Sequence, residues 1–237
     1  MSEQNEHHPA EHGGSSALRT ELLEHAPFSV SSVAIGLVFA GLLCYIAPVS
    51  QELVPSGQDH AGHSGYHLFH LFHPVHMFFS AAATTAMFWR YDHRVFKAVL
   101  VGLTGAIVVC GVSDILLPHF SLIFMGRRAP LHICVVENPE LVLPFAVMGM
   151  LVGLGAAGTV AGSTLFSHSL HVLASTMASI FYLIAPFGRV EWFSNAGRIF
   201  IFVTIAVMVP CCLSDIVFPL LMTKQARAKA LAAAHGH

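Results

Sequence analysis

Residues 110–118 read CGVSDILLP and residues 211–219 read CCLSDIVFP, so the chain contains two similar stretches that each hold one aspartate among apolar residues. An aspartate inside an apolar helix is rare and costly, which makes this match more specific than a match between apolar residues alone. Lys97 and Arg198 also stand the same number of residues before the aspartate of their stretch. The two stretches therefore predict an internal repeat.

Two further pairs of segments recur in the same order along the chain. PFSV at residues 27–30 returns as PFAV at residues 144–147. HPVH at residues 73–76 returns as HSLH at residues 168–171. Three landmarks in one order make chance a poor explanation of the similarity.

The composition is typical of a membrane protein. Of the 237 residues, 55% are hydrophobic and 10% are charged, whereas about a quarter of an ordinary soluble domain is charged. These values exclude a soluble globular enzyme and predict the lipid bilayer as a partner. The net charge of −2 gives no sign of a nucleic-acid-binding surface. No Walker, dinucleotide-binding or HExxH pattern occurs, so we expect neither an ATP-driven pump working alone nor an enzyme.

Stretches without charged residues predict six transmembrane helices. The expected helices lie at residues 29–48, 73–89 and 98–124, then as two helices within 141–188, and finally at 198–222. Each unit holds three spans, an odd number, so the second unit enters the bilayer from the opposite side. We expect an all-α polytopic membrane protein with six transmembrane helices arranged as two inverted three-helix repeats, as in many secondary transporters.

The positions of the basic residues predict the orientation in the membrane. An inside N-terminus places seven of the 11 basic residues inside. We therefore expect an integral protein of the prokaryotic inner (plasma) membrane with both termini inside, and the sequence leaves a homo-oligomer open. The expected segments are a polar tail at 1–26, a first repeat at 27–124 with a histidine-rich external loop at 51–72, a linker at 125–140, a second repeat at 141–222 and a basic tail at 223–237.

Histidines and aspartates recur at matching places in the two units and indicate metal sites. His73 and Pro74 are expected to open the second helix, which puts His76 in its first turn, where the helix dipole favours the neutral imidazole that binds metal. The helix that carries the aspartate should return to the same face of the membrane. We therefore expect one site per repeat, at opposite faces. The predicted metal ligands are His73, His76 and Asp114 in the first repeat and His168, His171 and Asp215 in the second.

Imidazole and carboxylate groups together suit Zn(II), Ni(II), Co(II) or Fe(II) better than Mg(II) or Ca(II), which prefer oxygen ligands. The alternatives are interfacial histidines bonded to backbone or lipid headgroups, and a proton or Na+ site at each aspartate. Cys110 and Cys211 stand one helical turn before the aspartates, but buried cysteines are common small hydrophobes, so both are accessory candidates only. The histidines before the second helix stand about one helical turn apart, which indicates an amphipathic lead-in to that helix. They could collect ions and are further accessory candidates: His60, His63, His67 and His70.

These features favour a membrane permease for a divalent transition-metal cation, with one His/Asp site per repeat as outer and inner gate. One alternative is a haem- or metal-binding membrane redox protein, although histidine pairs at opposite faces are too far apart to share one haem iron. Another is a metal-stabilised membrane scaffold or assembly factor. The linker stretch HICVVEN at residues 132–138 is interpreted as a loop followed by a helix start, with an additional polar gate at His132, Cys134 and Asn138 as the alternative.

Overall fold

The computed structural model describes residues 14–46, 60–127, 129–156, 164–187, 191–212, 218, 222 and 223, and the regular structure in these ranges is entirely helical. The long helices are α1 (Gly14–Ile46), α2 (His60–Tyr91), α6 (Pro139–Ala156), α7 (Thr164–Ile184) and α9 (Ala196–Cys212). One continuous rod joins α3 (Val95–Thr104) and α4 (Leu117–Phe124) through two π-helical turns, η2 (Gly105–Val109) and η3 (Val112–Leu116). The short helices α5 (Cys134–Glu137) and α8 (Glu191–Ser194) lie in connections.

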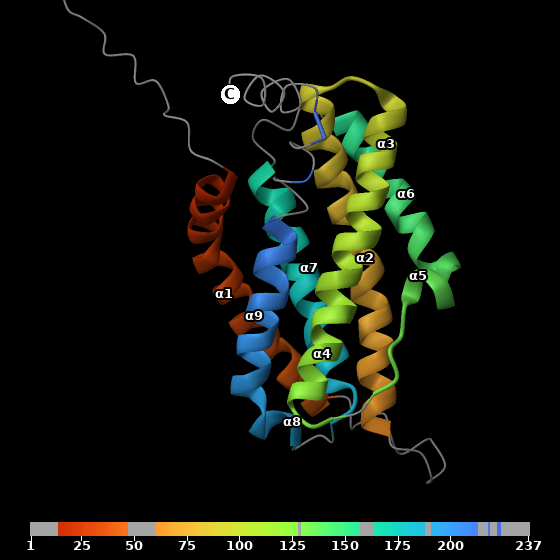
Figure 1. Ribbon diagram of the computed structural model, residues 1–237. Helices are drawn as coiled ribbons and strands as arrows, with labels where there is room; N and C mark the ends of the chain where they lie inside the picture. Colours follow the sequence, from red (N-terminus) through yellow and green to blue (C-terminus); the bar gives the residue numbers. More distant parts are fainter. Residues whose placement is uncertain are drawn as a thin grey trace, which may run out of the picture.

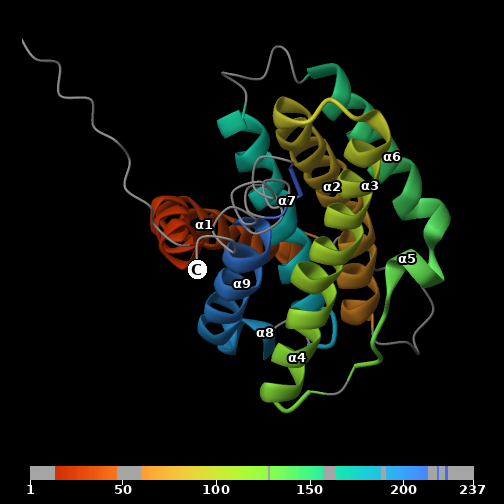
Figure 2. The same cartoon turned by 45° about the horizontal axis from the view of Figure 1, so that its top comes forward.

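Successive long helices alternate in direction (Figure 1). In this view α1, the α3–α4 rod and α7 descend, whereas α2, α6 and α9 rise. α2 and α7 contact each other at the centre of the bundle and run in opposite directions. α6 packs on α2, and α1 packs on α7 and α9, so the central pair is flanked on two sides (Figure 2).

Two of the described helices are long and apolar enough to cross a membrane. They are Ala26–Leu43 within α1 and Val95–Phe124, which is the whole α3–α4 rod. The apolar segments Pro139–Gly155, Ser169–Ile184 and Ala196–Cys211 are shorter. α2 is long enough, but its first half carries many histidines, which lower its hydropathy.

Large apolar side chains lie on the outside of the bundle, and many polar side chains lie inside it. Val38 on α1 is 75% exposed, Phe96 on α3 is 82% exposed and Phe124 on α4 is 81% exposed. A water-soluble monomer rarely exposes many large apolar groups together. Conversely, hydroxyl groups are buried on the two central helices at Ser80, Thr84, Thr85, Ser175, Thr176 and Ser179. This distribution fits a helix bundle whose outer surface meets an apolar medium.

Two helices begin well before the membrane spans expected from the sequence. α2 begins at His60, so the histidine-rich residues 60–72 are helical, as an amphipathic lead-in to the second helix would be, and Pro74 lies inside the helix rather than at its expected start. Proline removes one backbone hydrogen bond, but α2 packs along both α6 and α7, and this burial outweighs the loss. α1 begins at Gly14, within the segment expected as a polar tail. As a result, His73 and His76 lie in the middle of α2.

Glycines allow α6 to approach α2 closely. A Cβ at Gly153 would stand 2.5 Å from the carbonyl oxygen of Ala82 and 3.0 Å from the Cβ of Thr85. A Cβ at Gly149, one helical turn earlier, would meet the carbonyl oxygen of Phe78. Backbone atoms cannot turn aside as the end of a side chain can, so an added methyl group must push the two helices apart.

Replacing Gly153 by alanine should therefore lower the free energy of unfolding by about 1–3 kcal/mol, the usual cost of adding a group to a filled interface. Gly155→Ala is the matched control, because a Cβ at Gly155 would meet no neighbouring heavy atom within 4 Å. Thermal unfolding in detergent, followed by circular dichroism, measures both. Equal midpoints for the two variants would contradict the close contact between α2 and α6.

Candidate metal centre

A buried carboxylate connects α2, η3 and α7 at the centre of the bundle. Asp114 of η3 has no exposed surface. Its Oδ2 atom lies 2.8 Å from Nδ1 of His73 and 2.6 Å from Nδ1 of His76, both on α2. Its Oδ1 atom accepts hydrogen bonds from Ser113 at 2.8 Å and from Ser175 of α7 at 3.0 Å. The expected meeting of Asp114 with His73 and His76 is therefore present.

The bonds around Asp114 determine the tautomers of both histidines. An ionised carboxylate only accepts hydrogen bonds, so Nδ1 of His73 and Nδ1 of His76 each carry the hydrogen. In the neutral rings Nε2 then holds a lone pair. Histidines that bind metals commonly donate their other nitrogen to a carboxylate in this way. Asp114 is thus placed to orient two imidazoles, although the ligand atoms of all three side chains also lie within 4.8 Å of one another and could themselves hold an ion.

The opposite edge of the His76 ring faces sulfur and a second imidazole. Nε2 of His76 lies 3.6 Å from Sγ of Cys110 and 4.0 Å from Sγ of Cys211. The ring centroids of His76 and His171 are 4.6 Å apart. The ligand atoms of His76, His171 and Cys211 all lie within 4.8 Å of one another, and all three residues are buried. We call these three residues the central site.

The central site fits a borderline divalent metal ion. Zinc binds histidine nitrogen at about 2.0–2.1 Å and cysteine sulfur at about 2.3 Å, which places tetrahedral ligand atoms roughly 3–4 Å apart. Ligand atoms within 4.8 Å of one another need only small inward shifts to reach that spacing. Two nitrogens and one thiol favour Zn(II), Co(II), Ni(II) or Fe(II) over the hard ions Mg(II) and Ca(II).

The position of His171 corrects the prediction that the two histidine pairs lie at opposite faces. His171 lies beside His76 because both stand inside antiparallel central helices and not at helix starts. Cys211, which the sequence left as an accessory candidate, belongs to the same group of ligand atoms. His168 is in α7, but its side chain lies outside the described part of the structure, as does the whole of Asp215.

The histidines expected to collect ions divide into two groups. His60 and His63 are in the first turns of α2, and their side chains are not among those described. His67 is exposed, as an ion-collecting residue requires. His70 is half-buried and contacts His132 from the linker.

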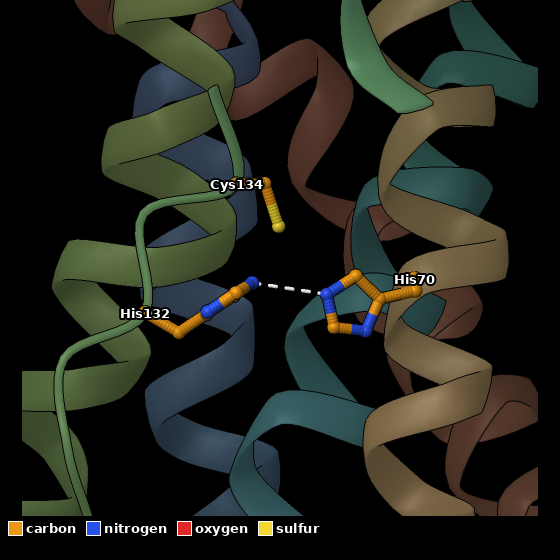
Figure 3. A group of neighbouring side chains, drawn as sticks. All are labelled: His70, His132 and Cys134. Atoms are coloured by element: carbon orange, nitrogen blue, oxygen red, sulfur yellow. Dashed lines mark hydrogen bonds between the residues drawn. The ribbon is translucent and has the colours of Figure 1, made fainter. Parts of the chain in front are cut away.

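A second cluster brings together His70, His132 and Cys134, a combination that was not predicted from the sequence (Figure 3). Its ligand atoms also lie within 4.8 Å of one another. The only signal in the sequence is the His-x-Cys spacing at residues 132–134, which is too short a pattern to predict a site by itself. Burial raises the pKa of the Cys134 thiol to about 12, and a hydrogen bond from the backbone N–H of Ile133 lowers the pKa of Glu137 beside His132.

Comparisons of the chain with protein-family models, with curated proteins and with solved structures find no match.

Replacing Asp114 by asparagine tests whether the carboxylate orients ligands or is a ligand. Asparagine keeps the size of the side chain but offers one acceptor oxygen in place of two, so we expect zinc affinity to fall about 10–100-fold with the number of bound ions unchanged. His76→Ala should instead remove the ion from the central site. Competition against a chromophoric chelator, with the protein purified in detergent, measures both. Loss of an ion in Asp114→Asn would show that the carboxylate is itself a ligand.

Proposed function

We propose that the chain is a membrane permease for a divalent transition-metal cation, which binds at the central site of His76, His171 and Cys211. The observation that carries the proposal is this buried group of two imidazoles and a thiol between two antiparallel helices. A metal ion bound there compensates the cost of burying the Asp114 carboxylate, because the cation lies near the negative charge.

A buried hydroxyl track supports passage of an ion through this centre. Towards the end of α2, the face that carries His76 continues through Ser80 and Thr84, which are both buried. Towards the end of α7, which runs in the opposite direction, the helix buries Ser175 and Ser179. Polar groups thus continue from the central site towards both ends of the bundle. Buried hydroxyls can replace part of the hydration shell of a cation, whereas an apolar interior cannot.

We further propose six transmembrane helices in two inverted repeats. The alternating helix directions and the apolar outer surface support this arrangement. Matching contacts support it too: a Cβ at Gly36 of α1 would stand 2.9 Å from Ile180 of α7, and a Cβ at Gly153 of α6 would stand 3.0 Å from Thr85 of α2. Gly36 and Gly153 occupy equivalent positions of the repeat, and so do Ile180 and Thr85.

A metal ion suits the centre better than haem, the alternative that the sequence leaves open. His76 and His171 are adjacent, so the two histidines are not separated by the membrane thickness as the sequence predicted. The short distance between the rings excludes a haem between them. Two imidazoles bound to one haem iron lie on opposite sides of the porphyrin, and rings whose centroids are 4.6 Å apart leave no room for that plane. A pure scaffold would need the ligands but not the hydroxyl track.

Transport assays in proteoliposomes test the permease. Zinc influx, followed with a trapped fluorescent indicator, should fall by more than about tenfold in His76→Ala and in His171→Ala, because one lost ligand costs more than the roughly 1.4 kcal/mol that a factor of ten represents. His67→Ala, which changes an exposed histidine of the same helix, is the control and should transport nearly normally at saturating zinc. Wild-type influx in both ligand variants would remove the central site from the route. Zinc binding without any influx in the wild type would favour a scaffold.

Reporter fusions test the number of spans. With six helices in the membrane, a reporter after Gly126 and a reporter after Gly162 lie on opposite sides, because α6 crosses between them. With only the two spans of α1 and the α3–α4 rod, the two reporters lie on the same side. Alkaline phosphatase and green fluorescent protein, which are active on opposite sides of a bacterial inner membrane, provide the measurement. Matching signals at the two positions would contradict the inverted repeat.

A further inference from the structure

The cluster of His70, His132 and Cys134 lies at the edge of the bundle where the link between α4 and α5 passes α2. His70 is on α2, one helical turn before His73, and the other two residues come from the link and the start of α5. Figure 3 shows the two imidazoles steeply tilted to each other with their Nε2 atoms facing, and the thiol of Cys134 directed towards the gap between them. His132 is 8% exposed and Cys134 is fully buried.

The hydrogen bonds of the two histidines leave two lone pairs facing each other. Nδ1 of His70 lies 2.8 Å from the carbonyl oxygen of Tyr66, which can only accept, so this nitrogen carries its hydrogen. Nδ1 of His132 lies 2.6 Å from Oε2 of Glu137, an acceptor as long as the carboxylate is ionised. In the neutral rings both Nε2 atoms therefore hold lone pairs, yet they are only 2.9 Å apart. Such a pair is stable only with a cation between or beside the two nitrogens.

The surroundings hold both rings in this orientation. Glu137 is fixed in turn, because its Oε1 atom accepts a hydrogen bond of 3.0 Å from the backbone N–H of Ile133. The ring of Tyr66 lies against both His70 and His132, with centroid separations of 4.9 Å and 5.1 Å. Backbone carbonyls and carboxylates are the usual partners of the second nitrogen of metal-binding histidines. The cluster thus has ligands, orienting partners and a packed wall.

We propose that His70, His132 and Cys134 form a second site for a divalent transition-metal ion, separate from the central site. The two Nε2 atoms and the sulfur are its ligands. On binding, the S–H bond of Cys134 breaks, the sulfur keeps the electron pair and bonds to the metal, and the proton leaves to the solvent. This inference concerns binding alone and holds whether or not the chain transports metal.

A shared proton is the competing explanation for the two facing nitrogens. A proton would convert one ring to imidazolium and satisfy both nitrogens, but it would leave the thiol without a role. A soft or borderline metal ion uses all three groups. The two explanations differ in whether Cys134 is a ligand, and this is what an experiment can detect.

Cobalt(II) is the probe, because a thiolate bound to it gives a near-ultraviolet charge-transfer band and tetrahedral coordination gives intense visible bands. The full-length protein in detergent should bind two cobalt ions per chain in equilibrium dialysis. In the double variant Cys110→Ala/Cys211→Ala, which removes both sulfurs near Nε2 of His76, the thiolate band should persist. Adding Cys134→Ser should abolish the remaining band and remove one bound ion. Serine preserves the size of the side chain, so packing around the link is kept.

Two further variants make the result decisive. Val136→Ala, which shortens a side chain that is 73% exposed in the same short helix, should keep both the ion and the band. His132→Ala should lose the same ion as Cys134→Ser, with helix content checked by circular dichroism. An unchanged band and unchanged stoichiometry in the Cys134→Ser background would overturn the second site and leave the shared proton. Loss of an ion on changing Cys211 but not Cys134 would support the central site alone, so the two sites fail independently.

Discussion

The Asp114 carboxylate has no exposed surface, and a charge in that position is stable only when donors take up its lone pairs. Four donors do so, two from imidazoles of α2 and two from hydroxyls of η3 and α7. Meeting this requirement fixes the rotation of α2 about its own axis and the approach of α7 through Ser175. The face of α2 that carries His70, His73 and His76 is therefore directed inward by one buried charge.

The central site and the cluster of His70, His132 and Cys134 have the same kinds of side chains, but the central site is more deeply buried. In each, two imidazoles stand beside a buried thiol, and oxygen acceptors hold the Nδ1 atoms of His76 in one cluster and of His70 and His132 in the other. His70, His73 and His76 connect the clusters along one face of α2, with about 4.5 Å of helix rise between successive residues. The ring of Phe69 contacts both His70 and His73, with centroid separations of 5.3 Å and 5.1 Å, and so lies next to the path between the two clusters.

Long apolar stretches, repeated motifs and an aspartate within an apolar stretch can be recognised in the sequence alone. For this reason the helical class and the group of His73, His76 and Asp114 could be predicted. The position of His171 could not, because the prediction used Pro74 as a local signal for a helix start, whereas packing along α6 and α7 decides where α2 begins. His132 and Cys134 meet His70 only through the path of the link after α4, and no periodic pattern connects them. The π-helical turns on either side of Cys110 likewise have no local sequence signal.

The two π-helical turns determine which face of the α3–α4 rod is directed towards α2. A π-helical turn holds one residue more than an α-helical turn, so converting one to the other rotates everything beyond it by about 100°, the angle of one residue in an α-helix. Asp114 lies within the second turn, and Cys110 lies between the two. If the first turn were α-helical, the Asp114 carboxylate would be directed away from His73 and His76, so its contacts with both imidazoles depend on the π-helical geometry. The two π-helical turns thus decide which side chain of the rod reaches the centre of the bundle.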